Sequence, residues 1–175
     1  NLAKVFVGRD AELAAIAAYL SDGPARPLVV SGASGSGKSA LMASAATRAG
    51  EAHGRGALAV RFVGATAAAS AGRRLLGDLC RQIGERYGAD DPVPDDLQEL
   101  TELLPQRMAL ATAEHPLLVF IDAVNQLPSG DPARRLAWLP AELPDHCKVV
   151  VSTIPGDTLD AAASRSPEML EVVPF

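Results

Sequence analysis

The feature that most constrains the fold is the octapeptide at residues 32–39, which reads GASGSGKS. It fits the pattern G-x-x-x-x-G-K-[ST], the phosphate-binding loop of nucleoside triphosphatases. An apolar run at residues 28–30 precedes it, and an alanine-rich, helix-favouring stretch at 38–49 follows. A strand, a loop and a helix in this order favour a true binding site over a flexible glycine- and serine-rich turn that fits the pattern by accident.

Each residue type in this loop has a chemical reason to be there. Gly32, Gly35 and Gly37 allow positive φ and let the backbone approach an anion closely. The loop N–H groups then point at a phosphate, supported by the positive end of the helix dipole. Lys38 supplies a mobile cation for the outer phosphates, and Ser39 a hydroxyl ligand for Mg²⁺. The nucleotide-binding residues expected in this segment are Gly32, Ala33, Ser34, Gly35, Ser36, Gly37, Lys38, Ser39 and Ala40.

Composition argues against several classes of function. Of the 175 residues, 48% are hydrophobic and 21% are charged, which suits one globular domain over residues 1–175. A net charge of −5 provides no basic field, so we expect no nucleic-acid binding by this segment. No apolar run approaches the ~20 residues that cross a bilayer, and no signal-peptide pattern opens the chain. We therefore expect no membrane partner.

The two cysteines bear on the compartment. Cys80 and Cys147 lack metal-ligand spacing, and buried thiols in a reducing compartment are favoured over a disulfide. We therefore expect a cytoplasmic protein. The sequence begins without Met and stops just after an apolar run, which suggests a piece of a longer protein.

Helix and strand patterns alternate along the chain. Helices are expected at 10–20, 38–49, 70–87, 96–113, 131–138 and 157–165, and strands at 28–31, 57–63, 117–121, 149–151 and 171–173. Asp10 and Asp131 are expected to cap helices, and Pro105 to break or kink one. This alternation predicts an α/β fold with a parallel sheet covered on both faces and ligands at the carboxyl ends of the strands.

The helix expected at 70–87 is amphipathic. Its polar side carries four arginines, namely Arg73, Arg74, Arg81 and Arg86. Such a row of charges is more typical of a solvated helix face than of a binding patch, and we interpret it as solvated.

Polar residues end two of the expected strands. Asp122 follows the buried run 117–121 and would hold Mg²⁺, directly or through water, opposite Ser39. The alternative is an aspartate that begins the next turn or caps a helix. Thr153, like Ser152 before it, would emerge near the γ-phosphate and sense it or orient water. Ordinary strand-end polarity explains these hydroxyls equally well.

Three segments together resemble the STAND class of P-loop ATPases, in particular its NACHT-like members and their Orc-like AAA+ relatives. Residues 5–13 resemble the hydrophobic-hydrophobic-GRxxEL signature that precedes the phosphate loop. Residues 120–127 look like the Walker B segment of NACHT-like proteins. Residues 139–144, with 148–156, are similar to their sensor-1 region. The resemblance covers nearly the whole chain.

The resemblance implies more than the residues alone do. It implies a three-layer P-loop NTPase fold, with a five-stranded parallel sheet of order 5-1-4-3-2 and helices on both faces. It implies that Val7, Gly8 and Arg9 lie near the adenine. It further implies that ATP/ADP exchange, with Mg²⁺, drives an oligomerisation switch in a larger signalling protein. Neighbouring ATPase domains and other protein effectors are the partners expected for such a switch.

The chain departs from the family pattern at two places. Asn125 and Gln126 stand where many relatives carry acidic residues, one of which polarises the attacking water. An amide orients water but cannot accept its proton, so we expect hydrolysis that is slow or depends on a partner. Ile154 stands where many relatives carry an arginine. Arg134 or Arg165 could instead act as an arginine finger in the site of a neighbouring subunit, and the alternative for each is an ordinary surface arginine. The catalytic residues expected are Lys38, Asp122, Asn125 and Thr153.

Two other functions remain open at this stage. A non-hydrolysing, nucleotide-gated scaffold would also explain Asn125 and Gln126. A P-loop kinase for a small molecule or nucleoside is disfavoured, because the sequence has no obvious arginine-rich lid or substrate-acid motif and gives the Gly8-Arg9 segment no role.

Overall fold

A single parallel sheet organises the chain. The computed structural model describes residues 8–64 and 71–174. Its strands are β1 (Leu28–Ser31), β2 (Leu58–Phe62), β3 (Leu117–Asp122), β4 (Cys147–Thr153) and β5 (Glu168–Glu171). They lie in the order β2-β3-β4-β1-β5, with every neighbouring pair parallel. Counted from β5, this is the order 5-1-4-3-2, so the predicted topology is confirmed.

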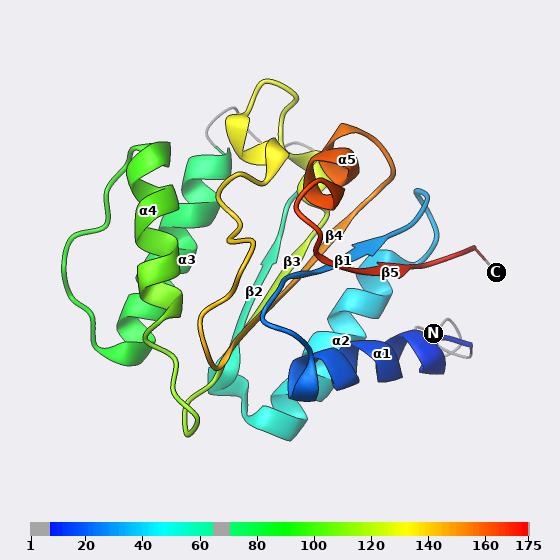
Figure 1. Ribbon diagram of the computed structural model, residues 1–175, viewed down its shortest axis with the longest axis horizontal. Helices are drawn as coiled ribbons and strands as arrows, with labels where there is room; N and C mark the ends of the chain where they lie inside the picture. The colour runs from blue at the N-terminus through cyan, green and yellow to red at the C-terminus, as the bar shows by residue number, and fades with distance from the viewer. Residues whose placement is uncertain (1–7, 65–70, 175) are drawn as a thin grey trace.

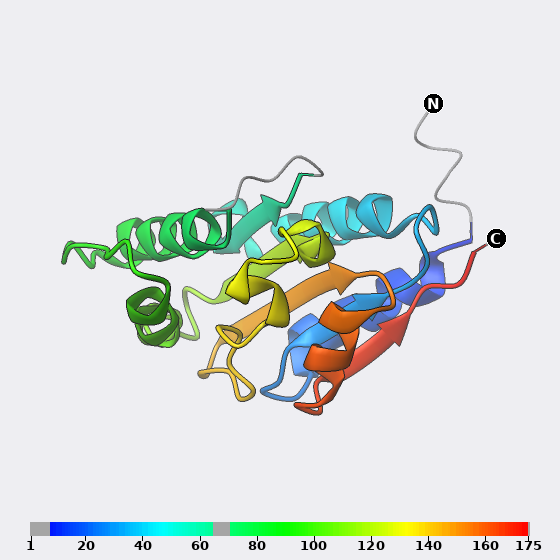
Figure 2. The same cartoon turned by 90° about the horizontal axis from the view of Figure 1, so that it is seen from above.

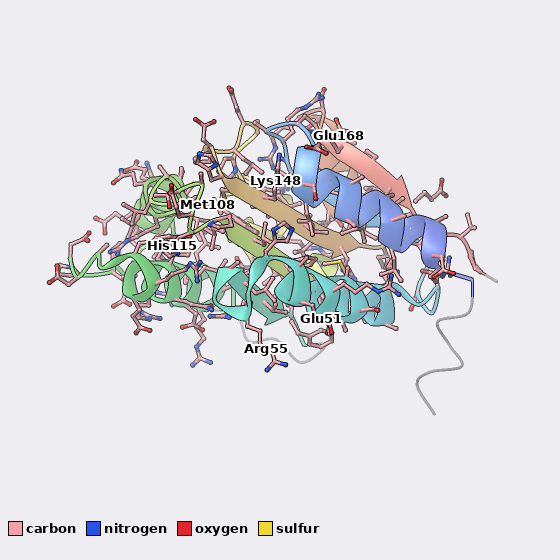
Figure 3. The ribbon with its side chains drawn as sticks, turned by 90° about the horizontal axis from the view of Figure 1, so that it is seen from below. Glu51, Arg55, Met108, His115, Lys148 and Glu168 are labelled. Atoms are coloured by element: carbon pink, nitrogen blue, oxygen red, sulfur yellow. The ribbon has the colours of Figure 1, made fainter. Side chains whose placement is uncertain are left out.

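Helices cover both faces of this sheet (Figures 1 and 2). They are α1 (Asp10–Asp22), α2 (Lys38–His53), α3 (Ala71–Tyr87), α4 (Leu97–Met108) and α5 (Asp157–Ala163), with short 3₁₀ turns η2 (Arg55–Ala57), η3 (Val124–Gln126) and η4 (Pro132–Arg135). One apolar cluster joins α1 and α2 to the sheet, and a second joins α3, α4 and α5 to the opposite face. Figure 3, seen from below, shows α1 and α2 together on their face of the sheet.

The interior strand β3 explains how one short apolar run supports two cores. All six of its residues are buried. Leu118 and Phe120 join the cluster under α1 and α2, whereas Val119 and Ile121 join the cluster under α3 and α4. Successive side chains of a strand point to opposite faces, so a continuous apolar run suits a strand that is covered on both sides.

Two helix predictions need correction. Arg9, not Asp10, is the N-cap residue of α1, and its side chain makes no capping bond. Asp10 lies instead in the first turn, where the positive end of the helix dipole stabilises its carboxylate. Helix α4 passes through Pro105 and ends at Met108 instead of reaching residue 113, because the backbone after it tightens into turns.

The last strand also lies elsewhere than expected. It covers Glu168–Glu171 and not 171–173. Its residues alternate between half-buried and exposed, with Met169 48% exposed, as suits the edge of a sheet. Pairing with β1 sets its position, since Leu28 lies opposite Glu168. No apolar run marks such a strand, so the sequence pattern pointed to the neighbouring valines.

The helix expected at 131–138 is much shorter. Only the 3₁₀ turn η4 forms, and it ends where Leu136 adopts a φ of +58°. The capping role of Asp131 is confirmed, because its carboxylate accepts the Ala133 N–H at 3.0 Å. The same carboxylate accepts the Gly72 N–H at 2.9 Å, so it joins η4 to the first turn of α3.

Two expectations from composition concern the cysteines and the membrane. Cys80 and Cys147 are buried, and neither forms a disulfide. Within residues 8–64 and 71–174, every helix is too short or too polar to span a bilayer.

Candidate nucleotide-binding site

The phosphate loop joins β1 to α2, and its glycines serve two different purposes. Gly35 and Gly37 have φ values of +78° and +88°, in the left-handed region that favours glycine. Gly32 does not adopt positive φ, and its role is to allow a close approach of the backbone. A Cβ atom at Gly32 would lie 2.4 Å from the Val172 carbonyl oxygen and 2.8 Å from Ser36 Oγ. Gly32 therefore allows the C-terminal segment to pack directly on the loop.

The N-terminus of α2 is open toward an anion. Its N-cap residue, Gly37, has no side chain with which to cap the helix, and no acidic residue lies in the first turn. The loop residues Ala33, Ser34 and Gly35 are exposed. Helix N-termini of this kind favour negative charge through the dipole and through the first N–H groups. The loop and helix can thus accept a phosphate group without first breaking a cap.

Lys38 folds back over the loop that precedes it. Its Nζ donates hydrogen bonds to the Gly32 carbonyl at 2.7 Å, the Ala33 carbonyl at 2.8 Å and Ser36 Oγ at 3.3 Å. Burial lowers the pKa of Lys38, and the negative charge of Asp122 acts in the opposite direction. The ammonium group is thereby held inside the loop, next to the space that the loop encircles.

Strand β4 separates β1 from β3 and adds hydroxyl groups between them. Ser152 Oγ donates to Asp122 Oδ1 and accepts the Ala123 N–H at 2.8 Å. Ser152 is fully buried, and Asp122 is 7% exposed. Ala123 has a φ of +62°, which a residue with a side chain rarely adopts. Ser152 therefore holds both the carboxylate and the strained turn after β3.

Thr153 occupies a different position from its neighbour. It lies opposite Ser31 in the pairing of β4 with β1, next to the start of the phosphate loop. Its side chain is buried, and Oγ1 donates to the Ile154 carbonyl at 3.1 Å. Of the two hydroxyls at the end of β4, Ser152 is the one that contacts Asp122, and no local sequence pattern distinguishes it from Thr153 in this respect.

Ser39 and Asp122 are the oxygen ligands expected for Mg²⁺. Ser39 is exposed in the first turn of α2, and Asp122 ends β3 at the same edge of the sheet. Within the described residues, Asp122 Oδ2 accepts no hydrogen bond, which leaves this oxygen available. No group of three or more His, Cys, Asp or Glu side chains that could hold a metal occurs in that part of the chain. A hydroxyl and one carboxylate fit Mg²⁺, which usually completes its shell with phosphates and water.

The segment after β3 carries the two amides. Asn125 lies in η3, and its Oδ1 is buried without a hydrogen-bond partner among the described residues. Gln126 is exposed. A buried amide oxygen without a partner is costly, so it commonly indicates a water or ligand contact. Asn125 is thus suited to hold a water molecule near Asp122, but not to remove its proton.

Arg9 connects three parts of the chain. It is 4% exposed, and its Nη1 donates to Glu12 Oε1 at 3.0 Å. Its Nη2 donates to the Ser36 carbonyl at 2.7 Å and to the Val173 carbonyl at 2.8 Å. Arg9 therefore joins the phosphate loop to the segment after β5, a structural role that the sequence did not reveal. Gly8, with a φ of +116°, is exposed beside it, and Val7 lies outside the described residues.

The two candidate arginine fingers are both engaged within the chain. Arg134 donates to the Leu127 carbonyl at 3.2 Å and to Asp157 Oδ1 at 3.1 Å. Arg165 donates to the carbonyls of Leu139 and Arg135, each at 2.9 Å, and burial lowers the pKa of Arg165. Either residue would have to give up these bonds to reach a neighbouring site.

Comparison with known proteins places this geometry in a family. The model of a family described as "AAA ATPase domain" matches residues 5–152. The human "NACHT and WD repeat domain-containing protein 2" is 33% identical over an alignment of 141 positions, which covers 76% of this chain and 8% of that protein. The human "NACHT domain- and WD repeat-containing protein 1" is 29% identical over a gapped alignment of 186 positions, which covers 98% of this chain and 12% of that protein. The chain thus spans about a tenth of these relatives.

A solved structure supports the same fold. A chain from the structure of Drosophila ORC bound to AT-rich DNA and Cdc6 superposes with a TM-score of 0.60. Sequence identity is 12%, and the match covers 97% of this chain and 60% of that chain. At this identity the likeness shows the fold alone. The family match over residues 5–152 and the NACHT-containing relatives confirm the resemblance that the sequence showed, and the chain belongs to the AAA ATPase domain family.

Proposed function

We propose that this chain binds ATP and ADP with Mg²⁺ through the phosphate loop and acts as a nucleotide-dependent switch. One observation carries the proposal: Lys38 is held inside a loop whose left-handed glycines lead into an uncapped helix N-terminus. Positive charge, N–H groups and a helix dipole then converge on one place, which is the arrangement that phosphate requires. The net charge of −5 supports a nucleotide over a nucleic acid as the ligand of this segment, although the Drosophila ORC structure contains DNA.

The roles of the site residues follow from their positions. The N–H groups of residues 33–40 would bind the phosphate oxygens, while Lys38 would leave its loop carbonyls to contact the outer phosphates. Ser39 and Asp122 would hold Mg²⁺, which when bound neutralises phosphate charge. Asn125 would orient a water, with Thr153 near the γ-phosphate. Gly8 and Arg9, with Val7 before them, would lie beside the base.

A switch, more than a fast hydrolase, is favoured by the region that follows β3. Asn125 presents an amide where a general base would be needed, so we expect ATP to be bound for long periods before hydrolysis. The Val172 N–H donates to the Ser31 carbonyl at 2.7 Å, and Arg9 bonds both the loop and Val173. These contacts support coupling of the occupied loop to the chain that follows β5.

The relatives suggest where such a switch would operate. Their names include WD repeats next to the NACHT domain, and the chain corresponds to 8% and 12% of their lengths. We infer that residues 1–175 are one nucleotide-binding domain of a longer cytoplasmic signalling protein. Its partners would be neighbouring ATPase domains and other protein effectors.

Calorimetric titration tests the binding proposal. Wild-type protein should bind ATP or ADP with Mg²⁺ in the micromolar range, and Lys38→Ala should bind about 100-fold more weakly, a loss of ~2.7 kcal/mol. Arg48→Gln is a matched control, because it removes an exposed cation elsewhere on α2 and should leave affinity unchanged. Heat-silent titrations of both wild type and Lys38→Ala, with circular dichroism showing folded protein, would reject the proposal.

A non-hydrolysing scaffold is the second candidate, and Asn125 is the observation that favours it. The two candidates share nucleotide binding and differ in chemistry. Phosphate release under single-turnover conditions in the full-length protein separates them: slow release supports the switch, and no release above the rate in buffer supports the scaffold.

A further inference from the structure

A pocket that contains three arginines lies on α3, apart from the nucleotide site. Its lining residues are Arg73, Arg74, Gly77, Arg81, Pro94 and Asp95, and its volume is about 270 Å³. Helix α3 packs on α4 and on β2, at one edge of the sheet. The phosphate loop follows β1, and β3 and β4 lie between β1 and β2 (Figure 1). The arginine pocket is therefore a separate feature of the molecule.

Gly77 provides the space for this pocket. It lies one helical turn from both Arg73 and Arg81, and the Arg81 guanidinium lies over it. A Cβ atom at Gly77 would be 3.1 Å from Arg81 Nη2. Glycine in a helix interior costs about 1 kcal/mol relative to alanine. The glycine thus weakens the helix locally and lets the Arg81 guanidinium lie against the helix backbone, where Gly77 lines the pocket.

The opposite wall of the pocket is fixed in place. Pro94 and Asp95 belong to the loop between α3 and α4, and buried Arg107 anchors that loop. Its Nη1 donates to the Ala89 carbonyl at 3.0 Å, and its Nη2 donates to the Asp91 carbonyl at 3.1 Å. Arg73 reaches across from α3 to the Asp95 carbonyl at 3.4 Å. A buried arginine and a cross-pocket contact thus hold the two walls together.

The charges in the pocket are not balanced. Arg81 pairs with Asp78 at 2.8 Å, and the Asp95 carboxylate belongs to the wall. Arg74 makes no hydrogen bond or ion pair with any residue in 8–64 or 71–174. The lining itself holds three guanidinium groups and one carboxylate, and guanidinium binds phosphate through paired N–H groups. Asp96, the next residue along the loop, uses its carboxylate to cap the first turn of α4, where it accepts the Glu99 N–H at 3.0 Å.

We propose that this pocket binds a phosphate-bearing anion, with Arg74 and Arg73 as the main donors beside Gly77. The anion is either a free oligophosphate or a phosphate monoester on an organic carrier, because both present the same oxygens to the guanidinium groups. The arginine face of α3 is thus a binding surface, in contrast to the solvated face that the sequence pattern favoured.

Calorimetry in the Lys38→Ala background tests this proposal. That background weakens phosphate binding at the loop, and any binding that remains there is the same in every variant, so a loss specific to the α3 variants reports on the arginine pocket. The probes are inorganic tripolyphosphate and phosphoserine, and the one that binds more tightly identifies the source of the phosphate. Binding of either should weaken about 10-fold in Arg74→Gln and in Gly77→Ala, and it should weaken further with added salt.

The variants include their own controls. Gly77→Ala should keep or raise the melting temperature, because alanine favours the helix, so weaker binding in this variant cannot come from unfolding. Arg48→Gln removes the same charge from α2 and should leave binding unchanged. The proposal is overturned if neither probe binds, or if Arg74→Gln and Gly77→Ala bind as tightly as the parent.

Discussion

The two halves of the candidate nucleotide site differ in how their polar groups are satisfied. On the loop half, Lys38 Nζ donates to three oxygens and Arg9 joins the loop to the C-terminal segment. On the β3 half, Asn125 Oδ1 is buried without a partner among the described residues, and Gln126 is exposed. The loop half is preorganised to hold phosphate, whereas the β3 half lacks a carboxylate at position 125 that could take a proton from water. From this difference we propose that the site retains nucleotide more than it turns it over.

The largest expected effect comes from supplying the missing base. Asn125→Asp should raise the single-turnover hydrolysis rate about 100-fold, at the low end of what general-base catalysis contributes. Its nucleotide affinity should stay close to that of the wild type. Phosphate release measured by quenched flow is the readout, and Asn125→Ala, which provides no base, is the control. An unchanged rate in Asn125→Asp would mean that something other than the base limits hydrolysis.

The loop half is tested by adding a side chain at Gly32, where the loop backbone packs closely against the C-terminal segment. In Gly32→Ala the new Cβ would meet the Val172 carbonyl at 2.4 Å, so the loop or the C-terminal segment must move. Overpacking of this kind costs about 1–3 kcal/mol. At ~2–4 °C per kcal/mol for a chain of this size, we expect a melting temperature lower by roughly 2–12 °C. Nucleotide affinity should fall as well.

Gly35→Ala provides the comparison for that variant. No atom lies within 4 Å of a Cβ at Gly35, so the strain comes from the φ of +78° alone and costs about 1–2 kcal/mol. Thermal melts with and without Mg·ADP should show that Gly32→Ala loses more of the ligand-induced stabilisation. Equal losses in the two variants would show that contact with the C-terminal segment does not shape the loop.

The smallest expected effect concerns the support of Asp122. Ser152→Ala removes the Asp122 hydrogen bond and leaves the Ala123 N–H without its partner, at a cost of about 1–3 kcal/mol. Nucleotide affinity measured with Mg²⁺ should fall by roughly 5–10-fold, within the 1.4 kcal/mol that a tenfold change represents. Affinity measured in EDTA should change little. A uniform loss under both conditions would assign Ser152 to general stability instead of metal support.

Local patterns in the sequence predicted most of the fold. The GASGSGKS motif and the run before Asp122 each lie within a single element, so spacing and apolar character were enough to find them. The edge strand β5 was predicted at the wrong residues, because its position is set by pairing with β1 and not by the apolar character of its own residues. Long-range contacts could not be predicted either, because they too depend on residues that are distant in the sequence.

The contacts that support the site illustrate this limit. Arg9 and Val173 are 164 residues apart in sequence, and Ser152 and Asp122 are 30 apart. Nothing in the local pattern distinguishes a buried arginine from a surface one, or Ser152 from Thr153. On α3, the pattern of arginines was visible, but the pocket that they form with the next loop was not.

The most direct test follows the fate of ATP bound in a single turnover. Radiolabelled ATP is mixed with excess protein and Mg²⁺, and both bound label and ADP formation are measured over time. We expect the label to stay bound and to convert at less than ~0.1 s⁻¹, about 100-fold below a typical enzyme turnover. Conversion at 1 s⁻¹ or faster, or failure to retain the label at all, would contradict a site that holds nucleotide without rapid hydrolysis.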